Sequence, residues 1–203
     1  MSRSVLVGRL AIWIVSEPQP HLSADERDAI VVAAKSAFAK LKNLYREIAP
    51  IIERYGFTVP SPGVIARDLS EKIETSIVQH CGSFSKGAGH ADLTRNGQDW
   101  EVKICKDSGL TINQSKSVAG ENYIVVNYKA SSQVTRVWVL WNAADELFSP
   151  RKANTNARSL RTSDAAAQIE VLFAASGIRV LPERAQPAIA KATITRKRRS
   201  RTA

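Results

Sequence analysis

The dipeptide Asn96-Gly97 constrains the fold of this 203-residue chain more than any other short stretch. Both residues tolerate the positive φ angles that a two-residue type I′ turn requires, so they predict a β-hairpin. Apolar and polar residues alternate over 100–105, as expected of a strand with one buried face. With Asn96 and Gly97 as the loop, Arg95 pairs with Gln98, and this pairing sets the register of both strands.

The same register brings acidic residues together. Counting outward from the turn, Asp92 lies opposite Glu101 and His90 opposite Lys103, and the period of two places all four side chains on one face. Directly opposed carboxylates destabilise a sheet, so a compensating group is expected. A divalent cation held by Asp92 and Glu101 would compensate, with Lys103 close to a bound water or phosphate. The alternative is a surface hairpin in which Lys103 neutralises the pair.

Asp92, followed after eight residues by Glu101-Val102-Lys103, resembles the core motif of the PD-(D/E)xK nuclease superfamily, which has the restriction-endonuclease-like fold. The resemblance implies that Asp92 and Glu101 bind Mg²⁺, which Mn²⁺ can replace, with help from the Val102 carbonyl. It also implies that Lys103 positions or activates the attacking water. The expected activity is a metal-dependent DNA endonuclease of the restriction, repair or resolvase type.

The resemblance extends over residues 65–141 and departs from the family motif at Ala91, where a proline is common. Within this range, apolar residues at every fourth position predict a helix over 65–82. The family often has a glutamate on this helix that points into the catalytic site. Glu74 fits that role best by its spacing, and Glu71 is the alternative. An ordinary exposed glutamate is the competing interpretation.

Several basic and polar residues are candidate contacts to nucleic acid. The loop 82–89 contains glycines that let the backbone approach a phosphate closely, and the loop 149–162 has basic and amide side chains but no acid. In the family, polar residues after the Glu-x-Lys strand often line the nucleic-acid groove. Solvated loops and a structural histidine at position 90 are the alternatives. The candidate nucleic-acid-binding residues are Lys86, His90, Gln114, Lys116, Arg151, Lys152, Arg158 and Arg161.

The rest of the chain supplies signals for further helices and strands. Ser23 and Glu26 form a capping box that opens a long helix, which we expect to run to about Ala49. Near-continuous apolar runs predict two buried central strands. We expect these strands at 123–128 and 134–141. A short helix is expected at 110–118, the last helix at 163–175, and an edge strand at 178–181.

These elements predict an α/β fold, in which a restriction-endonuclease-like mixed β-sheet of about four to five strands is flanked by helices, with an N-terminal helical extension. Residues 1–63 would form an N-terminal arm and helical region packed on the core. Residues 64–182 would form the nuclease core, and residues 183–203 a basic, disordered tail.

The net charge of +10 indicates a polyanionic partner, and the expected one is double-stranded or branched DNA. Six of the basic residues lie from Lys191 onward without an acid among them, so the body of the chain is only mildly basic. The two cysteines form no CxxC motif, and the apolar stretch 5–15 is too short to span a bilayer. We therefore expect a cytoplasmic protein with no membrane partner.

Cutting both strands of a duplex with one site per chain calls for two symmetric sites, so a homodimer is expected. The alternative function is a non-catalytic, basic nucleic-acid-binding protein on a nuclease-like fold. A decayed nuclease would be expected to have lost one member of the acidic and lysine set. Asp92, Glu101 and Lys103 are all present, which favours the nuclease.

Overall fold

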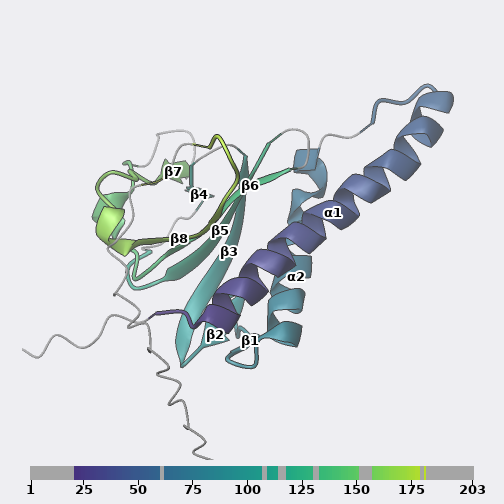
Figure 1. Ribbon diagram of the computed structural model, residues 1–203. Coiled ribbons are helices and arrows are strands. Elements are labelled where there is room, and N and C mark those ends of the chain that lie inside the picture. The colour runs from purple at the N-terminus through teal and green to yellow at the C-terminus, as the bar shows by residue number, and fades with distance from the viewer. Residues whose placement is uncertain are drawn as a thin grey trace, which may run out of the picture.

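The structure is a computed structural model, and it describes residues 21–59, 62–106, 109–113, 118–129, 133–150, 157–178 and 181. The described residues form a mixed α/β fold with two helices and a mostly antiparallel six-stranded sheet (Figure 1). The elements are α1 (Ala24–Arg54), α2 (Pro62–His80), β1 (Phe84–Lys86), β2 (Leu93–Arg95), β3 (Gln98–Lys106), β4 (Thr111–Asn113), β5 (Asn122–Tyr128), β6 (Val134–Leu140), β7 (Ala157–Ser159) and β8 (Ile169–Ala174), with 3-10 turns at Asp145–Leu147 and Ala166–Gln168.

The main sheet has the strand order β1-β2-β3-β5-β6-β8, and β4 pairs with β7 in a second, two-stranded sheet. Within the main sheet the β3–β5 pair is parallel, and the other neighbours are antiparallel. The predicted mixed sheet is therefore confirmed, although it has six strands rather than four or five. The parallel pair requires a crossover, and the chain makes it through β4 rather than through the helix expected at 110–118.

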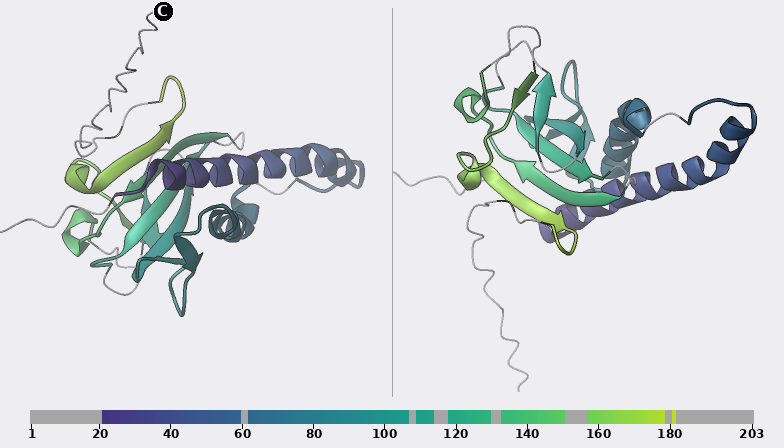
Figure 2. Two further views of the ribbon diagram at one scale, coloured as in Figure 1. Left: turned by 60° about the horizontal axis from the view of Figure 1, so that its bottom comes forward. Right: turned by 90° about the horizontal axis from the view of Figure 1, so that it is seen from above.

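Each face of the sheet has its own hydrophobic core. Helices α1 and α2 cover one face, whereas β4, β7 and the 3-10 turns cover the other (Figure 2). Along β3, Trp100 and Val102 belong to the core under the helices, so Glu101 and Lys103 point to the opposite face. The helical core also includes Phe38, Ile73, Leu93, Ile124 and Val137.

The capping box predicted at the start of α1 is confirmed. The Ser23 N–H donates to Glu26 Oε2 at 2.6 Å, and the Glu26 N–H donates to Ser23 Oγ at 3.2 Å. The helix continues past Pro50 to Arg54, further than expected, and its second half extends beyond the sheet (Figures 1 and 2). Because the first half of α1 shares a core with the sheet, this helix is part of the main body.

Glu26 also connects α1 to the hairpin. Arg95 Nε donates to Glu26 Oε1 at 2.6 Å, Arg95 Nη2 donates to Glu26 Oε2 at 3.0 Å, and Ser83 Oγ donates to the same carboxylate. Burial acts to raise the pKa of Glu26, but the hydrogen bonds from Arg95 and Ser83 outweigh it and lower the pKa to about 2. The start of α1 is thus held against β2 by a buried ion pair.

Several sequence-based assignments were wrong. Residues 169–174 form strand β8, where a helix was expected, because the free edge of β6 accepts them as a pairing partner. Residues 84–86 form β1 where a simple loop was expected, and 111–113 form β4 where a short helix was expected. Residues 178 and 181 are not in a strand. The N-terminal arm over 1–20 and the tail over 183–203 lie outside the described residues.

The two strongest predictions of buried strands are confirmed as β5 and β6, which are buried along their whole length. No described helix is both long enough and apolar enough to cross a membrane.

Candidate active site

The β2–β3 hairpin has the predicted turn and register. Asn96 and Gly97 have φ angles of 51° and 74°, as a type I′ turn requires. Arg95 pairs with Gln98, and the ladder continues to Leu93 opposite Trp100. Local turn chemistry therefore determines which β3 residues face which side of the sheet.

Asp92 lies where this ladder ends. Its N–H donates to the Trp100 carbonyl at 3.1 Å, although Leu93 is already paired with Trp100. Two residues of one strand thus oppose one residue of the other, which is the arrangement of a β-bulge. The Asp92 carboxylate then accepts a hydrogen bond from the Val102 N–H at 2.7 Å. The expected pairing of Asp92 with Glu101 is wrong, since the bulge moves the aspartate to the edge of β3.

The connection between β1 and β2 closes tightly beside this bulge. The Gly87 N–H donates to the Asp92 carbonyl at 3.1 Å, and a Cβ at position 87 would lie only 2.2 Å from the Ala91 carbonyl oxygen. Only glycine fits there without displacing backbone. His90 lies on this turn with its side chain exposed, so it is not paired opposite Lys103 as expected.

Glu101 and Lys103 are adjacent on one face of β3 and form an ion pair between Lys103 Nζ and Glu101 Oε2. The Glu101 side chain is 12% exposed and that of Lys103 is 28% exposed. Burial raises the pKa of Glu101, the contacts with Lys103 lower it, and the negative charge of Asp92 raises it further. The effect of Asp92 places its carboxylate in the electrostatic neighbourhood of Glu101 even without a backbone pair.

Glu74 lies on α2, which covers the face of the sheet opposite to Glu101 and Lys103. It is 7% exposed, and burial followed by the charge of Asp92 raises its pKa to about 7, against the opposing effects of Lys86 and Lys103. Glu71, the alternative, is exposed on the same helix. Glu74, rather than Glu71, is therefore the buried glutamate of α2 whose carboxyl is affected by the charge of Asp92.

The backbone of β3 offers one more oxygen at this position. In an extended strand the N–H and C=O of one residue face the same neighbour, so the Val102 carbonyl faces the side where Asp92 binds the Val102 N–H. Across the described part of the chain, no three His, Cys, Asp or Glu side chains are arranged to hold a metal ion. Mg²⁺ commonly takes one or two protein carboxylates and keeps several waters, so a donor set of two carboxylates and one backbone carbonyl has the oxygen chemistry that Mg²⁺ prefers.

Sequence reasoning missed two residues beside Glu101. Glu121 lies just before β5, and its negative charge also raises the pKa of Glu101. Tyr123 pairs with Glu101 across the β3–β5 ladder and donates its hydroxyl hydrogen bond to Glu121. No local sequence signal marks them, because the parallel pairing that brings them here depends on the crossover.

The candidate nucleic-acid contacts differ in their exposure and in their partners. Lys86 is exposed on β1, on the same face of the sheet as Leu93, and its charge acts on Glu74. Arg161 is exposed, and its Nε lies 3.3 Å from Asp164 Oδ2. The candidates Gln114, Lys116, Arg151 and Lys152 lie outside the described residues.

The Arg158 side chain is buried and hydrogen-bonded within the protein. Its Nη1 donates to Asp145 Oδ1 at 2.7 Å, its Nη2 to the Asp145 carbonyl at 2.6 Å and its Nε to the Ser149 carbonyl at 3.2 Å. The guanidinium also lies 5.5 Å from the ring centroid of Phe148. The buried Arg158 side chain thus connects β7 to the 3-10 turn at Asp145–Leu147. Because its donors are already paired, it does not contact nucleic acid in this structure as expected.

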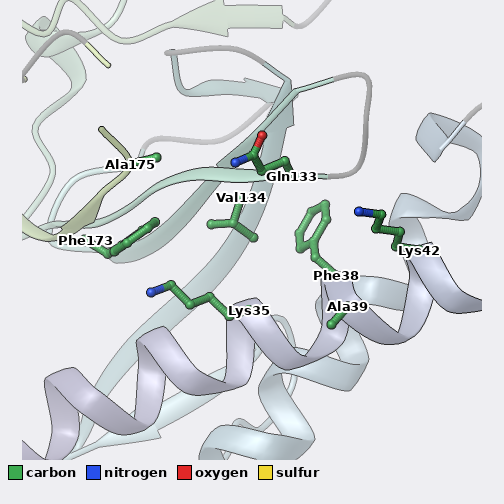
Figure 3. A pocket seen from close by; sticks show the side chains of 8 residues that line it. All are labelled: Lys35, Phe38, Ala39, Lys42, Gln133, Val134, Phe173 and Ala175. Carbon is green, nitrogen blue, oxygen red and sulfur yellow. The ribbon is translucent and has the colours of Figure 1, made fainter. Parts of the chain in front are cut away.

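A hollow of about 540 Å³ lies away from these carboxylates, between α1 and the ends of β6 and β8 (Figure 3). The Lys35 ammonium lies 3.6 Å from the ring centroid of Phe173, and Lys42 lines the other side. No carboxylate lines the hollow, so it lacks the groups for acid–base or metal chemistry.

Comparison with known proteins identifies no relative: no family model, no curated protein and no solved structure matches the chain.

Proposed function

We propose that the protein is a Mg²⁺-dependent endonuclease that hydrolyses phosphodiester bonds of DNA on a restriction-endonuclease-like fold. One observation supports this function above the others. Asp92, Glu101, Lys103 and Glu74 come from the bulge, β3 and α2, yet the charges of Asp92 and Lys103 act on both Glu101 and Glu74. Buried carboxylates beside a lysine, with one pKa near neutrality, are typical of a catalytic site.

The proposed ligands of the ion are Asp92, Glu101 and the Val102 carbonyl, and Mn²⁺ could replace Mg²⁺. The Asp92 carboxylate has one oxygen fixed by the Val102 N–H, so the aspartate is already oriented in the free protein. A bound Mg²⁺ would lower the pKa of a coordinated water and stabilise the negative charge that develops on the phosphoryl oxygens.

Lys103 would act on the water and the phosphate. The Glu101 carboxylate holds its ammonium on the face of β3, and the remaining N–H donors can orient the attacking water or bind a phosphate oxygen. Glu74 would accept a proton, because a carboxyl with a pKa of about 7 is partly ionised at neutral pH and can accept a proton readily. Lys86, whose charge acts on Glu74, would add positive charge for the DNA backbone at the β1 edge of the sheet.

The test is cleavage of plasmid, linear and branched DNA by the purified full chain, with Mg²⁺ or with EDTA. We expect nicked or linear product only with the metal, and none from Asp92→Ala or Glu101→Ala, while both variants keep their affinity for DNA. Asp99→Ala is the matched control, since Asp99 is exposed on the same hairpin. Full activity of Asp92→Ala would refute the assignment. DNA binding without cleavage in any divalent metal would instead support the non-catalytic alternative.

A further inference from the structure

The second half of α1 exposes large apolar side chains. Leu44 is 45% exposed and Ile51 54%, and just beyond the helix, which ends at Arg54, Tyr55 is 72% and Phe57 71% exposed. In the first half of the helix one apolar face is buried and Val32, on another face, is 61% exposed. The buried apolar residues are Ile30, Ala33, Ala34, Ala37, Phe38 and Leu41. The second half of α1 extends beyond the sheet (Figures 1 and 2). An exposed apolar surface of this kind marks an interaction site.

The spacing of these residues matches one kind of partner. Leu44, Ile48, Ile51 and Tyr55 follow each other at intervals of four, three and four, which are the d and a positions of two heptads. Pro50 falls at a c position of the same heptads, away from the apolar seam. A seam of this spacing packs best against another helix with the same repeat.

We propose that the partner is a second copy of this chain, bound antiparallel through the second half of α1. A two-fold axis between positions 49 and 50 would pack Leu44 against the partner's Tyr55 and Ile48 against the partner's Ile51, so each d residue meets an a residue. The surface would then be self-complementary, as a two-fold interface requires. This inference does not depend on the proposed nuclease function.

The charges beside the seam favour this orientation. Glu47 and Arg54 occupy g positions of successive heptads and both are exposed. In the antiparallel pair the two g positions face each other, so Glu47 meets the partner's Arg54 at two symmetric places. In a parallel pair Glu47 would face the partner's Ile52, and neither attraction would form.

The available area is compatible with a stable pair. At its observed exposure, the ring of Tyr55 could bury roughly 110–180 Å² per chain, which is a part of the ~800 Å² per partner of a standard interface. Leu44, Ile48 and Ile51 add aliphatic area to the same face. In such a dimer the two candidate active sites would be related by the two-fold axis, as cutting both strands of a duplex requires.

The test is the association state of the full-length chain, measured by sedimentation and light scattering over a range of concentrations. We expect a dimer. Glu47→Arg and Arg54→Glu should each raise the dissociation constant about tenfold or more, because each replaces two attractions by two repulsions. An equimolar mixture of the two variants should form a heterodimer with wild-type affinity, and the double variant should dimerise again.

Arg46→Glu is the matched control, because Arg46 is exposed but at an f position away from the seam, and it should leave association unchanged. Ile51→Asp should abolish the dimer while the circular dichroism spectrum stays that of the wild type. A chain that is monomeric at high micromolar concentration would overturn the proposal. So would a dimer that Ile51→Asp leaves intact, or a mixture of charge variants that fails to associate.

Discussion

Replacing Glu74 by glutamine should stabilise the protein at alkaline pH, and the size of the effect follows from the pKa of this residue. The pKa is about 7 in the folded protein and has an ordinary value of 4.5, so the folded state binds the proton more tightly. Between these values the folded state carries more protons than the unfolded state, and the free energy of unfolding therefore falls as pH rises. Below pH 4.5 both states are protonated and the penalty vanishes.

The magnitude is about 1.4 kcal/mol per pKa unit, so ionised Glu74 destabilises the metal-free protein by about 3 kcal/mol above pH 7. Glutamine has nearly the same shape and no charge, and it should remove this penalty. For a chain of this size the melting temperature of Glu74→Gln should exceed that of the wild type by roughly 6–12 °C at pH 8. The two proteins should melt at similar temperatures at pH 4.5. The measurement is thermal unfolding in EDTA at a series of pH values.

Glu71→Gln is the control, because Glu71 is exposed one turn earlier on α2 and acts on Glu74 only through its charge. Its effect on stability should stay within about 0.5 kcal/mol at every pH. The reasoning would fail if Glu74→Gln and the wild type differed by the same amount at pH 4.5 and pH 8. It would fail also if the variant were less stable at pH 8, since the carboxylate would then be a net stabilising group.

Three further outcomes follow from the structure. Lys103→Ala should lower the cleavage rate about 100- to 1,000-fold with a smaller effect on Mg²⁺ affinity. Lys106→Ala, at the exposed end of β3, should leave the cleavage rate unchanged, and an equal loss of rate in both variants would contradict the assigned role of Lys103. Glu26→Gln should lower the free energy of unfolding by about 3–5 kcal/mol at pH 7 in urea titrations, because it leaves Arg95 buried without its carboxylate partner. That loss should shrink as pH falls from 4.5 towards 2, where the wild-type carboxylate is itself protonated. Deleting residues 183–203 should flatten the salt dependence of DNA binding by up to roughly five in the log–log slope while saturated cleavage survives, and loss of all turnover would point to a catalytic role for the tail.

Local signals in the sequence predicted the hairpin, the capped helix and the two central strands well. Asn96-Gly97 determines its turn through backbone preferences alone, and Ser23 and Glu26 bond to each other within one turn. Such features depend on residues a few positions apart, so an isolated sequence contains most of the information. The prediction that Glu101 and Lys103 share one face of β3 is confirmed for the same reason, because the turn determines the register of the hairpin.

The errors came from contacts that local sequence preferences do not reveal. The alanine-rich stretch before β8 favours a helix, but the open edge of β6 recruits Ile169–Ala174 as a strand, and buried Glu170 bonds to Trp141 and Arg27 there. The position of Asp92 depends on the turn after β1, where Gly87 packs against the Ala91 carbonyl. Neither contact leaves a periodic pattern in the sequence.

The buried carboxylate of Glu26 also has a consequence for how the protein opens. The carboxylate bonds at once to the start of α1, to Ser83 before β1 and to Arg95 in β2, and Arg95 is 69 residues away from Glu26 in the chain. Neither the helix start nor the hairpin can separate from the other without leaving a buried charge unpaired. Their backbone amides should therefore exchange with deuterated water as one cooperative unit, and the end of the hairpin that carries Asp92 should be protected as long as the helix start is closed.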